Sequence, residues 1–306
     1  MIDARDHRLD VGVRPLLMGI LNATPDSFYD GGRHPDLDAQ VERARELLDE
    51  GADLIDIGGQ SAVTNRGPAS AAEEIERVAP LVEKVAALGA VVSVDTYRAE
   101  VAQAAIDAGA VMVNDPSGLS EPELALVCAR SRAALVVTHT RARPKQKLRD
   151  PRYADVVEDV RRFLDCRLRQ AQAVGVEESR LLVCPGPDLG KEPAQTIELL
   201  RRLEDLHELG RPILLSVSRK DFVGALLERP PRKRLAGTLA AIGHGVARGA
   251  GVLRVHDVAE TRDFLTVTAA LNGELELPDD LRVDDDIRWE LTAKEIDQAI
   301  LKEANA

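Results

Sequence analysis

Eight short apolar runs, each followed by a longer segment of mixed polarity, constrain the fold of this chain more than any other feature. They cover residues 16–21, 54–58, 91–94, 111–113, 134–137, 181–183, 213–217 and 252–255. Continuous apolar runs of this length are typical of parallel strands that are buried on both faces. The segments between them repeat apolar residues three and four positions apart, as at Val78, Val82 and Val85, which indicates amphipathic helices. The sequence therefore predicts an α/β fold of repeated strand–helix units.

Polar residues at the ends of the runs distinguish the two architectures that fit this alternation. A doubly wound open sheet is one, and a (β/α)8 TIM barrel is the other. Polar or reactive groups lie at or just after the end of every run, namely Asn22, Gln60, Asp95, Asn114, His139, Cys184, Ser218 and Arg254. Only a closed barrel brings eight strand ends around one mouth, where barrel enzymes place their chemistry. We therefore predict a (β/α)8 TIM barrel.

The barrel pattern stops near Gly273, which predicts two regions. Residues 1–273 form the barrel, and residues 274–306 form a short acidic C-terminal extension with one amphipathic helix, which begins at a capping box between Thr292 and Glu295. Residues 274–286 hold seven acidic side chains and one arginine, so about half of the net charge of −12 belongs to the extension. A length of 306 residues suits one barrel with such an appendage.

Charge and cysteine content exclude several classes of partner. An acidic chain is a poor ligand for nucleic acid or for an anionic membrane, and no apolar stretch is long enough to span a bilayer. The first residues have no apolar core typical of a secretory signal. Three widely spaced cysteines, Cys128, Cys166 and Cys184, predict neither a disulfide framework nor a zinc site. We expect a soluble cytoplasmic protein.

Two segments carry the clearest chemistry. The first run ends in Asn22, and a turn sequence follows through Thr24 to Asp26; taken alone, this could be only a tight turn before a helix. The last two runs end in SRK (residues 218–220) and RVHDV (residues 254–258). Arginine, lysine and histidine at neighbouring strand ends are good anion ligands, although an isolated charged rim is the simpler explanation for each.

The combination of motifs resembles the dihydropteroate synthase family. It comprises residues 18–32, IDIGG at 55–59, SVDTYRAEVA at 93–102, the Asn-Asp and Ser-Gly pairs within 114–118, SRK at 218–220, the Gly-Thr pair at Thr238, and RVHDV. The motifs are colinear over residues 14–273. The resemblance implies a transferase of folate biosynthesis that condenses 6-hydroxymethyl-7,8-dihydropterin diphosphate with p-aminobenzoate and releases diphosphate. It also implies a homodimer that packs through barrel helices.

The resemblance also implies a set of site residues. Asp95, Asn114 and Lys220 match the family's catalytic, pterin-holding positions, and Asn22 matches its Mg²⁺ ligand. The substrate-binding positions would be Asn22, Thr24, Asp26, Cys184, Ser218, Arg219, Arg254 and His256. Among them, Arg254 and His256 would meet the diphosphate, while Ser218 would lie where the p-aminobenzoate pocket meets the pterin.

The chain departs from the family pattern at four places, which are the second loop, residues 138–144 after the fifth run, Ser216 before SRK, and Cys184. The second loop reads GGQSAVTNRGP, so Ala62 and Val63 replace a threonine and an arginine. Cys184 replaces the aspartate that pairs with the pterin, and Asp188 follows four residues later. A buried charge-assisted contact contributes about 2–4 kcal/mol, so its loss would weaken the site. Cys184 could otherwise be a small buried apolar residue at a strand end.

These departures leave three functions open. The first is a working synthase. The second is a divergent paralogue that binds a pterin or phosphorylated ligand with weak, altered or no synthase activity. The third is a methyltransferase that uses methyltetrahydrofolate, which also holds a pterin in a barrel; the diphosphate-handling set of Asn22, Arg254 and His256 makes it the weakest of the three.

Overall fold

The computed structural model of the chain describes residues 1–23, 37–60, 69–144, 146, 148–284 and 287–289. It divides into two compact units, Met1–Phe264 and Leu265–Ala306. The strands of the first unit are β1 (Ile2–Ala4), β2 (His7–Leu9), β3 (Leu16–Asn22), β4 (Leu54–Gly58), β5 (Val92–Asp95), β6 (Met112–Asp115), β7 (Ala134–Thr138), β8 (Leu181–Cys184), β9 (Ile213–Leu215) and β10 (Ala250–Val255). The α-helices are α1 (Leu37–Asp49), α2 (Ala71–Ala86), α3 (Ala99–Asp107), α4 (Glu123–Ser131), α5 (Val156–Ala173), α6 (Pro193–Arg201), α7 (Asp221–Leu227), α8 (Leu235–Val246) and α9 (Val258–Leu271).

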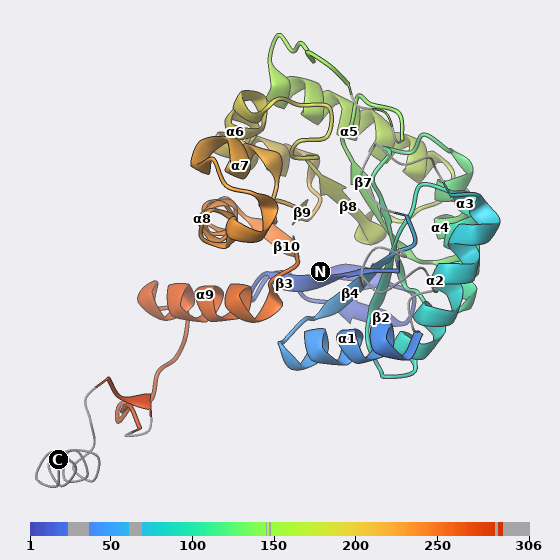
Figure 1. Cartoon of the computed structure of the whole chain (residues 1–306). Coiled ribbons are helices and arrows are strands. Elements are labelled where there is room, and N and C mark those ends of the chain that lie inside the picture. Colours follow the sequence, from blue (N-terminus) through green and yellow to red (C-terminus); the bar gives the residue numbers. More distant parts are fainter. Residues whose placement is uncertain (24–36, 61–68, 145, 147, 285–286, 290–306) are drawn as a thin grey trace, which may run out of the picture. The chain divides into compact units, whose positions relative to one another are not determined.

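Within the described residues, eight parallel strands close into a barrel in the order β10-β3-β4-β5-β6-β7-β8-β9. The ring closes because β10 pairs with β3 on one side and with β9 on the other. Each barrel strand corresponds to one of the eight apolar runs, and helices α1 to α8 lie outside the ring (Figure 1). The predicted (β/α)8 TIM barrel is therefore confirmed, and the open sheet is excluded. The helix expected from Thr292 onward lies outside the described residues.

Local capping explains where two of the outer helices begin. Ser70 precedes α2 and accepts a hydrogen bond from the Glu73 amide, while the Glu73 carboxylate accepts one from the Ser70 amide. Asp155 caps α5 by accepting from the amides of Val157 and Glu158. Such caps satisfy amide groups that have no partner inside the helix. They define the positions at which the loops above the barrel pass into helices.

A hairpin of β1 and β2 covers the amino-terminal end of the barrel. Ile2 and Ala4 are fully buried and belong to the same apolar cluster as the barrel interior. The amide of Arg5 donates to Arg132 O at 2.8 Å, and its guanidinium donates to Ile106 O at 2.9 Å, just before β7 and β6 begin. Because this end is closed by apolar side chains, the opposite, carboxyl-terminal end is where polar groups collect.

Candidate active site

Alternate side chains of the barrel strands point into the interior. Towards the amino-terminal ends these are apolar and pack in one buried cluster with Met18, Leu54 and Met112 among its members. Closer to the carboxyl-terminal ends, the interior residues Asp56, Asp95, Asn114 and Arg254 are polar, while Cys184 still packs in the apolar cluster. The site therefore consists of polar groups on an apolar floor, as expected for a barrel enzyme.

The centre of the site is an ion-paired cluster contributed by four strands. The guanidinium of Arg254 on β10 donates through Nε to Asp56 Oδ2 on β4 at 2.6 Å. It also donates through Nη2 to Asp95 Oδ2 on β5 at 2.7 Å. Asn114 on β6 donates from Nδ2 to Asp56 Oδ2 at 3.0 Å. Three of the predicted site residues are thus brought together, and a fourth residue joins them.

That fourth residue, Asp56, was missed as a site residue by sequence reasoning. It is fully buried and is the common acceptor for Arg254 and Asn114. A signal was available, because a carboxylate inside the apolar run LIDIG, two positions after the interior residue Leu54, must face the interior. Its second oxygen, Oδ1, accepts no hydrogen bond from the described residues. A buried carboxylate oxygen without a donor is rare, so this atom is available to a ligand or to water.

Burial and mutual charge set the protonation of this cluster. Burial, together with the negative charge of Asp56, raises the pKa of Asp95 to about 7 against the attraction of Arg254. Burial opposes the charge of Arg254 as well, but the attraction of both carboxylates raises its pKa above the usual value. Arg254 therefore stays charged, and Asp95 titrates close to neutral pH. Ionisable groups with a strongly shifted pKa in a barrel mouth are typical of active sites.

Cys184 ends β8 beside the predicted pterin residue Lys220. It is only 3% exposed, and burial raises the pKa of its thiol, despite a hydrogen bond from the Gly186 amide and the nearby charge of Lys220. Burial likewise lowers the pKa of the Lys220 ammonium. The end of β8 therefore places a neutral thiol next to Lys220, whereas an aspartate at this position would form an ion pair with the lysine.

Asp188 does not take the place of a carboxylate at Cys184. Its Oδ2 accepts from the amides of Asp221 at 2.6 Å and Phe222 at 3.2 Å, and its Oδ1 accepts from Thr196 Oγ1 at 2.9 Å. The carboxylate is therefore engaged at the start of α7. We conclude that Cys184 is the group that the barrel interior presents at the end of β8.

The ends of β9 and β10 place the remaining predicted residues side by side. Ser218 Oγ lies 2.9 Å from His256 Nδ1, and Arg219 forms a bidentate ion pair with Asp257. Burial and the charges of Arg219 and Arg254 lower the pKa of His256 to about 4. The imidazole is therefore neutral near pH 7, and it acts through hydrogen bonds. Arg219 is partly neutralised by Asp257, which leaves it less charge to offer a ligand.

The predicted Mg²⁺ ligand, Asn22, is the last residue of β3. In the barrel register it pairs with Gly58 on β4, and Gly58 in turn pairs with Asp95 on β5. The described residues contain no group of three histidine, cysteine or acidic side chains that could hold a metal. A single amide oxygen at a strand end nevertheless fits Mg²⁺, which keeps several waters and is often bound by one or two protein oxygens plus substrate phosphates. Thr24, Asp26, Ala62 and Val63 lie outside the described residues.

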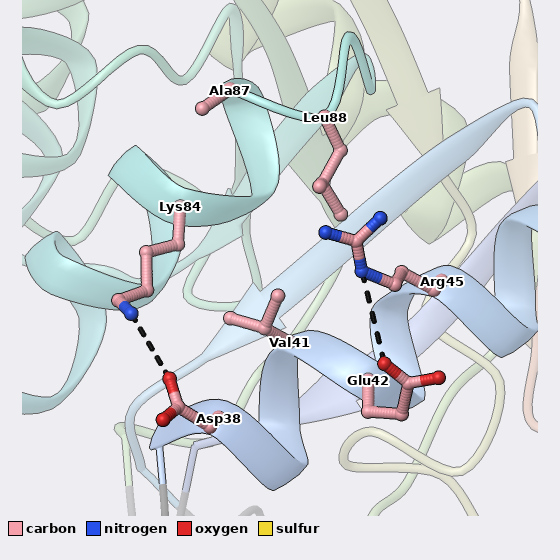
Figure 2. Close-up of a pocket in the computed structure, with 7 residues that line it drawn as sticks. All are labelled: Asp38, Val41, Glu42, Arg45, Lys84, Ala87 and Leu88. Carbon is pink, nitrogen blue, oxygen red and sulfur yellow. Dashed lines mark hydrogen bonds and ion pairs between the residues drawn. The ribbon is translucent and has the colours of Figure 1, made fainter.

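A pocket of about 410 Å³ between α1 and α2 is separate from this site. It is lined by Asp38, Val41, Glu42, Arg45, Lys84, Ala87 and Leu88. Figure 2 shows ion pairs between Lys84 and Asp38 and between Arg45 and Glu42 along its walls. None of the predicted site residues lines it. The ion-paired cluster inside the barrel is therefore the better candidate for the active site.

Comparison with known proteins agrees with this geometry. A closed parallel barrel with its polar cluster at the carboxyl-terminal strand ends defines the class of (β/α)8 barrel enzymes. A family model described as "Pterin binding enzyme" matches residues 18–256. The chain belongs to this family of pterin-binding enzymes.

Individual relatives are dihydropteroate synthases. The enzyme from Synechocystis sp. is 40% identical over 267 residues, which is 86% of this chain and 92% of the relative. The solved structure of Xanthomonas albilineans dihydropteroate synthase with 4-aminobenzoic acid has a TM-score of 0.81 at 42% identity and covers 88% of this chain and 96% of that chain. A structure of the same enzyme with 7,8-dihydropteroate has a TM-score of 0.79 at 42% identity and covers 88% and 97%.

Proposed function

We propose that this chain is a dihydropteroate synthase. It would be a transferase in which the amine of p-aminobenzoate attacks the methylene carbon of 6-hydroxymethyl-7,8-dihydropterin diphosphate. The carbon–oxygen bond to diphosphate breaks, diphosphate leaves, and the amine loses a proton. Relatives at 37–42% identity over most of the chain support this assignment. The observation that carries it is the cluster in the barrel mouth in which Arg254 donates to both Asp56 and Asp95 and Asn114 donates to Asp56.

This cluster suits the recognition of a pterin ring. The ring presents a row of donors and acceptors, and carboxylate and amide groups in a cavity shielded from water can pair with that row. Asp95 supplies a carboxylate and Asn114 supplies an amide. Oδ1 of Asp56, which accepts no hydrogen bond from the described residues, supplies another acceptor. If carbon–oxygen cleavage precedes attack, the methylene becomes cationic, and these buried carboxylates would stabilise it electrostatically.

The diphosphate would bind on the side of the site formed by β10 and β3. Arg254 supplies a permanent charge and His256 supplies a neutral hydrogen-bonding group. Asn22 would hold Mg²⁺, which would neutralise the charge that develops on the leaving diphosphate. These residues lie around one mouth because β10 and β3 are neighbours in the ring.

Two measurements test the proposal. Titration calorimetry with the dihydropterin diphosphate, with and without Mg²⁺, should give saturable binding that is stronger with the metal. A steady-state assay with p-aminobenzoate should then release diphosphate and form dihydropteroate in equal amounts. The absence of both binding and turnover in folded protein would refute the assignment.

A second candidate is a paralogue that binds the pterin without efficient transfer. The buried Cys184 favours it, because a neutral thiol cannot accept strong hydrogen bonds or stabilise a cation as a carboxylate does. Binding without product formation in the same two measurements would select this alternative.

We also propose that the protein is a homodimer that packs through α6, α7 and α8. An apolar groove of about 330 Å³ runs between these helices, with Phe222, Val223, Leu226 and Leu227 among its lining residues. Leu226 is 64% exposed, and exposed apolar patches of this kind mark interaction sites. Sedimentation analysis should give a dimer for the parent protein and a monomer for Leu226→Glu. A monomeric parent would refute this proposal.

We propose the cytoplasm as its location. Cys128, Cys166 and Cys184 are all free thiols among the described residues, which suits a reducing compartment. The part of the chain that the structure describes contains no helix of the length and apolarity required to cross a membrane.

A further inference from the structure

The segments that follow β7 and β8 are joined by a buried lysine that the proposed reaction does not use. Lys191 is 6% exposed, and its Nζ donates to Gly186 O at 2.9 Å and to Leu189 O at 3.2 Å. The same nitrogen lies 2.7 Å from Nδ1 of His139, which is fully buried just after β7. One ammonium group thus binds its own loop internally and ties that loop to the neighbouring strand.

The geometry of His139 makes it the acceptor in this contact. Its other ring nitrogen, Nε2, lies 3.4 Å from Asp159 Oδ1 on α5. Burial and the charge of Lys191 lower the pKa of His139 to about 3, so the ring is neutral. A neutral ring that donates from Nε2 to Asp159 presents a lone pair at Nδ1 to the lysine.

The loop after β8 also packs closely against the end of β7. Gly186 has a φ of +64°, and a β-carbon at this position would lie 2.0 Å from His139 O. The His139 amide donates to Cys184 O at 2.9 Å, which continues the strand pairing to the start of this loop. Lys191 therefore closes a compact loop that begins directly after Cys184.

The far side of the same loop holds the start of α7. Asp188 accepts from the amides of Asp221 and Phe222, the two residues that directly follow Lys220. Thr196 on α6 fixes Asp188 by donating to its Oδ1 and by accepting from its amide at 3.1 Å. Through this contact, the position of the loop determines the position of the backbone that carries Lys220.

We propose that Lys191 is a positioning residue for the pterin site. It holds the loop of residues 185–191 between β7 and α7, and it thereby sets the places of Cys184 and Lys220 around the pterin without touching the substrate. The choice of the dihydropterin diphosphate as ligand rests on the proposed function, whereas the effect of Lys191 on the loop can be measured without any ligand.

The test replaces Lys191 with methionine, which keeps the length of the side chain and removes the ammonium group. Lys84→Met is the matched control, because it makes the same chemical change at an exposed ion pair on α2. We expect Lys191→Met to weaken binding of the dihydropterin diphosphate at least about tenfold, while the KM for p-aminobenzoate changes less than about threefold. Asp188→Asn should act in the same direction. The double variant should be less impaired than the product of the two single effects, because both act through one loop.

Hydrogen exchange on the ligand-free protein gives an independent readout. Lys191→Met should speed exchange in residues 185–191 and 220–224 and leave α2 unchanged. Faster exchange together with parental pterin affinity would refute the positioning role, and so would unchanged exchange in both segments. If Lys191→Met does not fold, the same two readouts on Asp188→Asn decide the matter. Failure of the proposed function would appear differently, as a parent protein that binds no pterin diphosphate.

Discussion

Replacing Cys184 with aspartate is the sharpest test of how this barrel binds its substrate. The thiol is buried at the end of β8, and the groups around it are suited to a negative charge. The Gly186 amide, the Thr138 side chain and the charges of Lys220 and Lys191 all act to lower the pKa of the thiol. A carboxylate at this position would therefore be ionised and would face two ammonium groups.

The size of the gain follows from the contacts that a carboxylate would make. Each buried hydrogen bond to a charged group contributes about 1.5–3 kcal/mol, and about 1.4 kcal/mol corresponds to a factor of ten. One such contact between the pterin and the carboxylate introduced by Cys184→Asp would raise pterin affinity about 10- to 100-fold. The cost of burying the charge is offset by Lys220 and Lys191, whose own pKa values would rise beside it.

The assay compares three proteins. Calorimetry with the dihydropterin diphosphate and steady-state turnover with p-aminobenzoate are measured for the parent, for Cys184→Asp and for Cys184→Asn. The asparagine variant has the same shape as the aspartate variant and no charge, so it isolates the electrostatic contribution. Thermal denaturation of each variant shows whether the fold is retained.

The reasoning fails if folded Cys184→Asp binds and turns over within about threefold of the parent, since that is well below the gain from one charge-assisted contact. An equal gain in Cys184→Asn would also refute it, because the effect would then come from shape or hydrogen bonding alone. A loss of affinity would indicate that the chain binds a pterin derivative for which the thiol is the better partner.

Three further predictions concern the same end of the barrel. Asp56→Asn should destabilise the protein by about 3 kcal/mol and raise the KM for the pterin diphosphate, because Arg254 loses a buried partner; unchanged thermal stability and KM would contradict this. His139→Gln should reduce the stability lost between pH 6.5 and 4.5 by about 2 kcal/mol. The unfolded histidine takes up a proton in that range and the folded one, with a pKa of about 3, does not; parallel urea-denaturation profiles for parent and variant would refute this. Gly186→Ala should cost at least about 2 kcal/mol more in thermal denaturation than Gly210→Ala, which has the same φ of +64° and open space around it; equal losses would rule out the close approach to His139.

Much of the fold could be predicted from the spacing of apolar residues. Strands buried on both faces must be apolar along their whole length, so the eight runs marked the eight barrel strands directly. Asp95, Asn114 and Arg254 could be proposed as site residues because strand ends in a barrel share one mouth, and the structure brings them together. The pattern of apolar residues alone was enough to predict the strands. Every strand–helix unit has a buried strand that runs in the same direction, so the same pattern recurs in each unit.

The pairings within the site were decided by tertiary structure. Arg254 and Asp56 are 198 positions apart, and Lys191 and His139 are 52 apart. Nothing in the local sequence of any of the four indicates its partner, because the contacts depend on ring closure and on how neighbouring loops pack. The same packing of strands and loops raises the pKa of Asp95 and places Asp188 at the start of α7. It also buries Cys184 near two lysines. The sequence by itself therefore determined the barrel and the types of group at its mouth. Only the closed tertiary structure decided which charged groups form pairs, because a buried charge is stable only when an oppositely charged or hydrogen-bonding partner lies beside it.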